Sequence, residues 1–232
     1  AMPLVVRPGA LRRNSLTSIQ SSESQTDVRT TVVTTNEPSP WDTFQGILKD
    51  AKLEYRSFSF QDDDDDDFFQ PITEERLNAY GADIIAAVRT SNVSELRRMY
   101  VEEGRRMDGC NRFGESVLHT ACRRGEAAVL RFLVAEQKTN GGAGVDLRVR
   151  DDYGRTPMHD ACWTAADEPN VELLRILLQE WPDLLLVQDK RGSTPLQYIR
   201  SGQWSAWNKF LRDHRTMLIP KQLTLRPLEE EG

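Results

Sequence analysis

The chain has 232 residues, 38% of them hydrophobic, and a formal net charge of −6 at pH 7. This length allows one domain of roughly 150 residues and a tail. No stretch of about eighteen apolar residues occurs, so the sequence predicts no membrane-spanning helix. The lack of an apolar core near the start excludes a secretory signal.

Residues 1–70 are predicted to form a disordered tail, because they are rich in Ser and Thr and hold few large apolar residues. Within the tail, Trp41, Phe44 and Leu48 can share one face of a short amphipathic helix. That helix either docks on the first unit of the following domain, which is favoured, or presents a motif to a partner. The Arg-rich and Ser-rich start leaves organelle import as a minor alternative. Ala1 precedes Met2, so an upstream piece of the protein can be missing.

Six consecutive aspartates, Asp62–Asp67, precede Phe68 and Phe69. The favoured interpretation is a solvated spacer that holds the tail away from the domain. A second interpretation is a binding segment whose carboxylates steer towards a basic partner, including the arginines of the domain itself. A calcium loop is disfavoured, because Phe68 stands where the sharp turn of such a loop needs glycine.

Two tail serines match short kinase-substrate patterns and are candidate phosphorylation sites. Ser15 follows the basic pair Arg12 and Arg13, and Ser39 precedes Pro40. A phosphate on Ser15 would partly neutralise the two arginines.

Residues 74–108 are predicted to form a polar capping unit of two short helices. Ile84, Val88, Leu96 and Met99 follow helical spacing. Asn92 with Glu95 three positions later predicts a capping box at the start of the second helix.

Three later segments repeat one pattern: NRFGESVLHTAC from Asn111, DDYGRTPMHDAC from Asp151 and DKRGSTPLQYIR from Asp189. In each, a turn-forming residue is followed three positions on by a glycine that can take the positive φ of a tight turn. Thr-Pro then starts a helix in the second and third segments, and apolar residues at helical spacing predict another helix. A unit repeated about every forty residues predicts a stacked solenoid.

These segments resemble ankyrin repeats, whose mark is a turn followed by Thr-Pro-Leu-His and a small residue. The matches are SVLH from Ser116, TPMH from Thr156 and TPLQ from Thr194, where Gln197 replaces the histidine. The resemblance implies an all-α ankyrin-repeat solenoid of about four helix-turn-helix units, long enough to be stable alone. The expected domain is 74–219, divided into 74–108, 109–146, 147–186 and 187–219, with residues 220–232 disordered.

By this resemblance the protein binds another protein through its turn tips and the concave face of its first helices. The expected contact residues are Arg112, Phe113, Glu115, Asp152, Tyr153, Arg155, Lys190 and Arg191 on the turns, with Arg123, Arg124 and Trp163 on the helices. The structural alternatives are packing of Phe113 and Tyr153 against the next turn and ordinary solvation of the arginines. The remaining alternatives for function are a phosphorylation-controlled adaptor whose tail competes for this face and a piece of a larger enzyme.

Catalytic and metal chemistry is not expected. The pairs His119 with Cys122 and His159 with Cys162 fall at equivalent places in adjacent units, too far apart for one zinc ion. By the resemblance, these histidines instead bond the turn and the helix start. No nucleophile has a placed base, so we expect no enzyme, cofactor or metal site.

The remaining expectations concern partners and location. The mixed charges of the turn tips argue against a nucleic acid partner. The three cysteines, of which two are expected to be buried, fit a reducing compartment. The sequence therefore predicts a monomeric cytoplasmic or nuclear protein.

Overall fold

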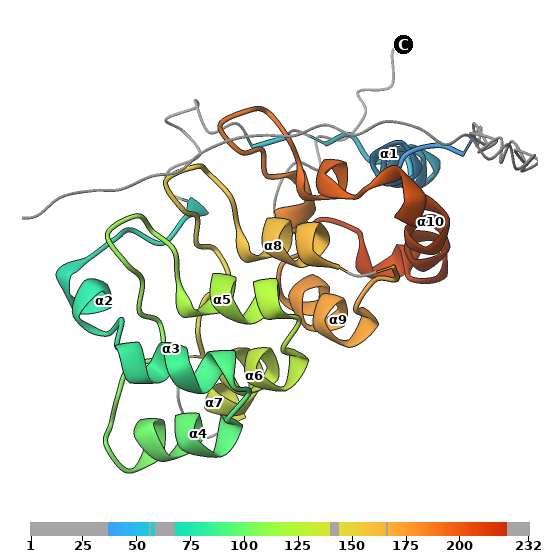
Figure 1. The fold of residues 1–232 in the computed structure, drawn as a ribbon. Coiled ribbons are helices and arrows are strands. Elements are labelled where there is room, and N and C mark those ends of the chain that lie inside the picture. Colours follow the sequence, from blue (N-terminus) through green and yellow to red (C-terminus); the bar gives the residue numbers. More distant parts are fainter. Residues whose placement is uncertain (1–36, 56, 59–67, 140–143, 166, 222–232) are drawn as a thin grey trace, which may run out of the picture. The chain divides into compact units, whose positions relative to one another are not determined.

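The computed structural model describes residues 37–55, 57–58, 68–139, 144–165 and 167–221. All of them belong to one compact unit that begins at Asn36. In the described part of the chain, helices are the regular secondary structure apart from two isolated β-bridges, and they stack in consecutive pairs (Figure 1). None of the described helices is both long and apolar enough to cross a membrane.

Each unit contributes a first and a second helix, and the first helices pack on one another in the order α3, α5, α8 and η4. The first unit holds α2 (Glu74–Asn78), α3 (Ala82–Arg89) and α4 (Val93–Val101); the second holds α5 (Val117–Arg124) and a second helix made of α6 (Ala127–Arg131), the π-helical turn η2 (Phe132–Glu136) and α7 (Gln137–Thr139). The third holds α8 (Pro157–Thr164), α9 (Val171–Glu180) and η3 (Pro182–Leu186); the fourth holds η4 (Pro195–Tyr198), η5 (Ser201–Gln203), α10 (Trp204–Asp213) and η6 (Arg215–Met217).

The tight turns form as their residues predict. In the third unit, Asp151 Oδ1 accepts hydrogen bonds from the backbone N–H groups of Tyr153 at 2.9 Å and Arg155 at 2.8 Å. Gly154 between them has φ of 78° and donates to the carbonyl of Asp151. Asn111 and Asp189 make the same set of bonds in the neighbouring turns. Each turn is therefore closed by its own residues.

Adjacent turns are also tied to each other. The N–H of Asp152 donates to the carbonyl of Phe113 at 2.7 Å, and the N–H of Lys190 donates to the carbonyl of Tyr153 at 2.9 Å. The turns consequently line up along one border of the stack, which confirms the arrangement that the glycine spacing predicts.

The histidines of the repeated motif connect units. The N–H of Thr156 donates to His159 Nδ1 at 3.1 Å, and His159 Nε2 lies 3.1 Å from the carbonyl of Ser193 in the next turn. His119 repeats this pattern one unit earlier. In the fourth unit Gln197 Oε1 accepts the Thr194 N–H, and the described residues include no fifth turn whose carbonyl a histidine here could reach. Glutamine in place of histidine at this position therefore keeps the bond to the helix start and removes no bridge between described units.

The seams between units hold the apolar residues that the helical spacing picks out. Leu118, Leu130, Leu133 and Leu177 have no exposed surface. Each such side chain contributes roughly 1.5–3 kcal/mol relative to an exposed position, so the seams supply most of the favourable energy of the stack.

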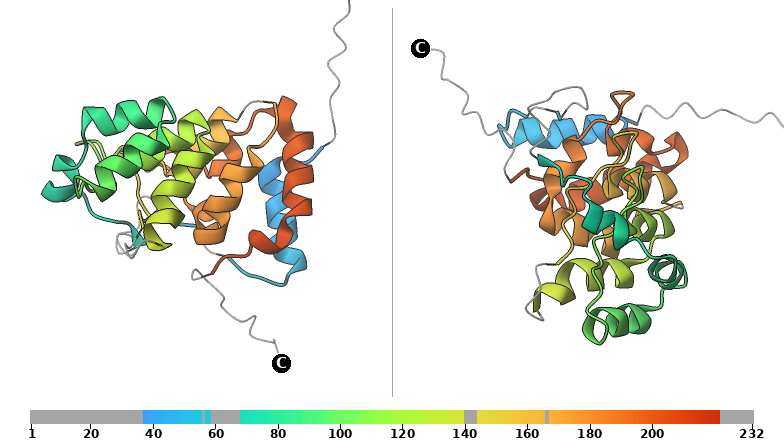
Figure 2. Two further views of the ribbon diagram at one scale, coloured as in Figure 1. Left: turned by 90° about the horizontal axis from the view of Figure 1, so that it is seen from below. Right: turned by 90° about the vertical axis from the view of Figure 1, so that its left-hand side faces the viewer.

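Helix α1 (Pro40–Asp50) docks at the end of the stack opposite to the one that the sequence favoured. It packs on α10 and η4 of the fourth unit rather than on the first unit (Figure 2). Phe44 and Leu48 are fully buried there, and Asn208 Nδ2 donates to the carbonyl of Pro38 at 2.8 Å. Part of the expected disordered tail is thus an ordered cap on the last unit. α1 covers the outer face of the fourth unit, on which no further repeat packs among the described residues.

The chain then runs back along the stack. Phe58 forms a parallel bridge with Val187, and its ring stacks on Phe68 with ring centroids 4.8 Å apart. The N–H of Gln70 donates to the carbonyl of Arg148 at 2.7 Å. The aspartate run between these two phenylalanines lies outside the described residues. Because the residues on either side of it are docked, the run is not the boundary between tail and domain.

Two smaller expectations differ from the structure. The first helix of the fourth unit is the short 3₁₀ turn η4, because the backbone becomes extended at Ile199. Only half of the expected capping box forms at α4: Asn92 accepts from the Glu95 N–H, but the Glu95 carboxylate turns to Arg98 instead of bonding back.

Candidate partner-binding surface

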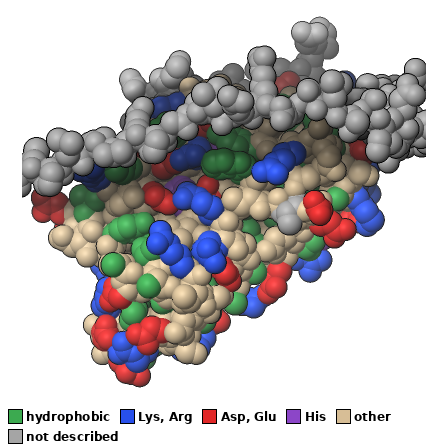
Figure 3. All heavy atoms as spheres, viewed as in Figure 1, with side chains coloured by type: hydrophobic (Ala, Val, Ile, Leu, Met, Phe, Trp, Pro, Cys, Tyr) green, Lys and Arg blue, Asp and Glu red, His purple; other side chains and the backbone are tan. Residues whose placement is uncertain are grey.

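Three aromatic side chains stand exposed along the turns and first helices. Phe113 is 48% exposed, Tyr153 is 55% exposed and Trp163 is 44% exposed. Phe113 and Tyr153 therefore do not pack beneath the next turn. Figure 3 shows hydrophobic side chains and Lys and Arg side chains gathered together in the middle of this face.

Arginines hold these rings in place. The guanidinium of Arg112 lies 4.6 Å from the Phe113 ring centroid, and that of Arg155 lies 5.0 Å from the Tyr153 centroid and 5.9 Å from that of Trp163. Arg155 is fixed in turn, because its Nε and Nη2 donate to Asp151 Oδ2 at 2.9 and 2.6 Å. A cation above an aromatic face is attractive. Tyr153 and Trp163 thus sit on a braced platform.

A second braced arginine joins two units. Arg123 Nη1 donates to Glu115 Oε1 at 2.8 Å and its Nη2 to Asp160 Oδ2 at 3.0 Å. Asp160 is almost completely buried, and burial raises the pKa of its carboxyl although Arg123 opposes the shift. Breaking this bridge would leave a buried carboxylate unpaired, which is costly.

Tyr198 extends the cluster into the fourth unit. Its ring lies 6.1 Å from that of Trp163, and its hydroxyl donates to Asp189 Oδ2 at 2.6 Å. Burial, and the hydrogen bond to Asp189, raise the pKa of Tyr198. The aromatic platform therefore spans the third and fourth units.

On the exposed part of this face, basic side chains outnumber acidic ones. Asp151, Asp160 and Asp189 are buried and Asp152 is exposed, whereas Arg124 and Arg191 are among the exposed basic residues. Within the part of the chain that the structure describes, neither of these two arginines makes an ion pair. The sequence shows similar numbers of acidic and basic residues at the turns, but the side chains exposed to a partner are mostly basic.

The structure brings some predicted residues together and leaves others apart. Glu115 joins Arg123, and Arg155 joins Tyr153 and Trp163, whereas exposed Arg124 and Asp152 make no side-chain contact with these clusters among the described residues. The sequence interpretation missed Asp160 and Tyr198. They occupy the same position of the repeated motif in consecutive units, three residues before the position that Arg123 and Trp163 share in their own units, and this spacing is the signal that could have indicated them.

The buried His and Cys residues serve the structure of the stack. Burial lowers the pKa of His119, and it lowers the pKa of His159 to about 4, so both rings are neutral near pH 7. Burial raises the pKa of the Cys122 and Cys162 thiols. No group of three potential metal-ligating residues gathers anywhere in the described ranges.

Comparison with known families decides what kind of stack this is. The model for ankyrin repeats in three copies matches residues 84–180. The chain is an ankyrin repeat-containing protein. The matched range runs from α3 to α9, within the first three units described above, and domains of this kind are typically non-catalytic protein-binding modules.

Similar proteins cover only part of the ankyrin repeat chain. The human and bovine proteins named "SMC5-SMC6 complex localization factor protein 1" are each 31% identical over 109 residues, which is 47% of this chain. The chain spans only 9% of the length of those relatives. Among solved structures, an ankyrin repeat domain from Acinetobacter baumannii is 26% identical, with a TM-score of 0.47, over 59% of this chain and 65% of that one.

Proposed function

We propose that this ankyrin repeat protein is a non-enzymatic scaffold that binds a partner protein through its turn tips and first helices. The observation that supports this most is the exposed aromatic platform of Tyr153 and Trp163, braced by Arg155. Aromatic residues and arginines are enriched at the centres of binding sites. Because the platform is already ordered, association avoids much of the entropy cost of fixing side chains.

We further propose that the partner presents an acidic segment. The support is the charge of the exposed face, where Arg124 and Arg191 project without carboxylate partners among the described residues. Complementary charge raises the rate of association and weakens with salt. Binding should therefore weaken as the salt concentration rises.

The test is quantitative capture of partners from lysate of the native cells. The intact chain is compared with the double variant Tyr153→Ala, Trp163→Ala and with Val101→Ala as the matched control, because Val101 is exposed on α4, away from this face. The proposal is supported by proteins that bind both the intact chain and Val101→Ala. The same proteins should not bind the double variant, and they should not bind the intact chain in high salt. Equal recovery by the double variant and the intact chain would refute it.

A second candidate function is a phosphorylation-regulated adaptor. Its support is the place of Ser39, which caps α1: its Oγ donates to Asp42 Oδ2 at 2.7 Å and accepts the Asp42 N–H. A phosphate on Ser39 would repel the carboxylate of Asp42 and replace the hydroxyl that donates to it, so this capping box would be lost. Ser15 lies outside the described residues. Mass spectrometry that finds Ser39 unmodified in native cells under all conditions would eliminate this candidate.

We propose a monomer in the cytoplasm or nucleus. The support for the compartment is the burial of all three free cysteines, Cys110, Cys122 and Cys162, which fits a reducing environment. Fractionation of native cells, with size-exclusion chromatography of the recovered protein, tests both statements.

A further inference from the structure

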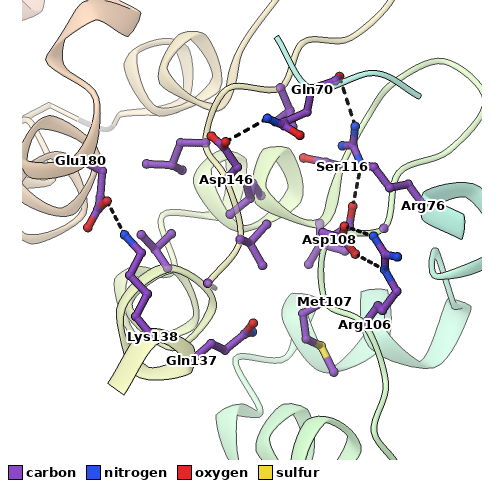
Figure 4. A pocket seen from close by; sticks show the side chains of 18 of the residues that line it. Gln70, Arg76, Arg106, Met107, Asp108, Ser116, Gln137, Lys138, Asp146 and Glu180 are labelled. Atoms are coloured by element: carbon purple, nitrogen blue, oxygen red, sulfur yellow. Dashed lines mark hydrogen bonds and ion pairs between the residues drawn. The ribbon is translucent and has the colours of Figure 1, made fainter. Parts of the chain in front are cut away.

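A cavity of about 600 Å³ lies between the second helix of the second unit, the loops that flank it and α2 (Figure 4). This volume is within the range of roughly 300–1,000 Å³ typical of small-molecule sites. Val117, Val134 and Leu147 give it apolar walls. It shares no residue with the aromatic platform, so it is a separate feature of the molecule.

A buried amide nitrogen lines the cavity. Gln137 is only 5% exposed, and its Nε2 makes no hydrogen bond to any of the described residues. A buried amide group without a partner costs about 1–3 kcal/mol. The π-helical turn Phe132–Glu136 comes directly before it; such turns carry an extra residue, rotate the residues that follow and occur often at functional sites. The turn thus places a polar residue where the seam would otherwise be apolar.

A buried cation that makes no ion pair with a described residue also lines the cavity. Arg76 is 6% exposed, and its Nε and Nη1 donate to the carbonyls of Asp108, Gln70 and Pro71. Its Nη2 makes no hydrogen bond to any residue that the structure describes. One donor of a buried guanidinium is therefore still available.

The carboxylates that line the cavity are already engaged. The pairs are Asp108 with Arg106 at 2.6 Å, Asp146 with Arg148 at 2.6 Å and Glu180 with Lys138 at 2.5 Å. Among the described residues Arg76 makes no ion pair. The Asp108 carboxylate is hydrogen-bonded to Arg106, and this bond, helped by the charge of Arg76, lowers the pKa of Asp108. A buried cation of this kind favours an anionic ligand.

We infer that the cavity binds a small organic carboxylate with an apolar body and an amide, of the N-acyl amino acid type. The carboxylate of the ligand pairs with Arg76 Nη2, and its apolar side chain lies between Val117, Val134 and Leu147. The carbonyl of its amide accepts a hydrogen bond from Gln137 Nε2. The same chemistry is offered by a free N-acyl amino acid and by the C-terminal residue of a protein chain.

The probe is N-acetyl-L-leucine, and its matched control is the uncharged N-acetyl-L-leucinamide, both titrated into the full chain and followed by amide NMR shifts. The acid should bind, with shifts at Val117, Gln137 and Val145, and the leucinamide should bind at least about tenfold more weakly, since a hydrogen bond to a charged group contributes roughly 1.5–3 kcal/mol. Equal binding of the two probes, or no binding of the acid, would overturn the inference.

Variants then separate binding from folding. Gln137→Leu should weaken N-acetyl-L-leucine about tenfold without lowering the melting temperature, because it removes a buried amide that lacks a partner; exposed Gln179→Leu is the control and should change neither. Arg76→Lys keeps the charge near the carboxylate and should retain part of the affinity. Unchanged affinity in Gln137→Leu would contradict the assignment of the amide.

A third comparison identifies the source of the ligand. The peptide acetyl-Ala-Ala-Leu is titrated with a free and with an amidated C-terminus. Tighter binding of the free peptide than of N-acetyl-L-leucine indicates a chain terminus, and weaker binding indicates a free small molecule. Failure of every free carboxylate would refute both sources.

Discussion

At the residue scale, the glycine turns show where backbone freedom is required and where space is required as well. Gly114 and Gly192 have nearly the same φ, 76° and 75°. A Cβ on Gly114 would lie 2.5 Å from the Arg150 carbonyl, whereas one on Gly192 would meet nothing within 4 Å. The two positions therefore separate backbone strain from close packing.

We expect Gly192→Ala to lower the free energy of unfolding by about 1 kcal/mol, the cost of a left-handed conformation for alanine. Gly114→Ala should cost at least about 2 kcal/mol more, because the turn must also move away from Arg150. Urea unfolding of the two variants measures the difference. Equal losses would show that adjacent turns are not packed as described.

The histidine bridges predict a dependence of stability on pH. Burial lowers the pKa of His159 to about 4, below its ordinary value of 6.5. The unfolded chain therefore binds a proton at higher pH than the folded chain does. The stability from neutral His159 is complete above about pH 6.5 and is lost as the pH falls towards 4.

His159→Gln should flatten this dependence, since Gln197 shows that a glutamine can accept the same Thr N–H. Over this pH window we expect the variant to lose roughly 3 kcal/mol less than the native chain. Urea unfolding from pH 7 to 4 gives the slopes, and subtraction removes the titration of the carboxylates. Parallel slopes would contradict a neutral buried His159.

At the element scale, α1 packs on the fourth unit in the way that a neighbouring repeat packs on the other units. Phe44→Ala should lower the free energy of unfolding by about 3–5 kcal/mol, as for other buried phenylalanines. It should also increase the rate of amide hydrogen exchange in α10 more than in α4. Exposed Lys49→Ala is the control. Unchanged exchange in α10 would show that α1 does not stabilise the fourth unit.

The elements also show how far sequence can predict this fold. The turns at Gly114, Gly154 and Gly192 were predictable, because each is closed by residues within five positions of one another. The docking position of α1 was not predictable, because the apolar face that includes Phe44 could pack equally well on either end of the stack. The π-helical turn before Gln137 was hidden for a similar reason: an apolar run does not reveal one extra residue.

At the scale of the whole molecule, the repeats predicted the stack and the general location of the exposed face. They did not predict its charge, because the pairing of buried Asp160 with Arg123 is a contact between two units. The cavity could not be predicted either, since Arg76 and Gln137 lie in different units and are brought together only by stacking. The turn closures within each repeat are thus predictable from sequence, whereas the contacts between repeats are not.

The most direct test of the central claim is site-specific photo-crosslinking in native lysate. The photoreactive residue p-benzoylphenylalanine replaces Tyr153 on the platform or, as the control, Val101 on α4, which is 62% exposed. We predict crosslinks to a distinct partner from position 153 that disappear at high salt and are absent from position 101. The same products from both positions, or none from position 153, would contradict the assignment of this face as the partner-binding surface.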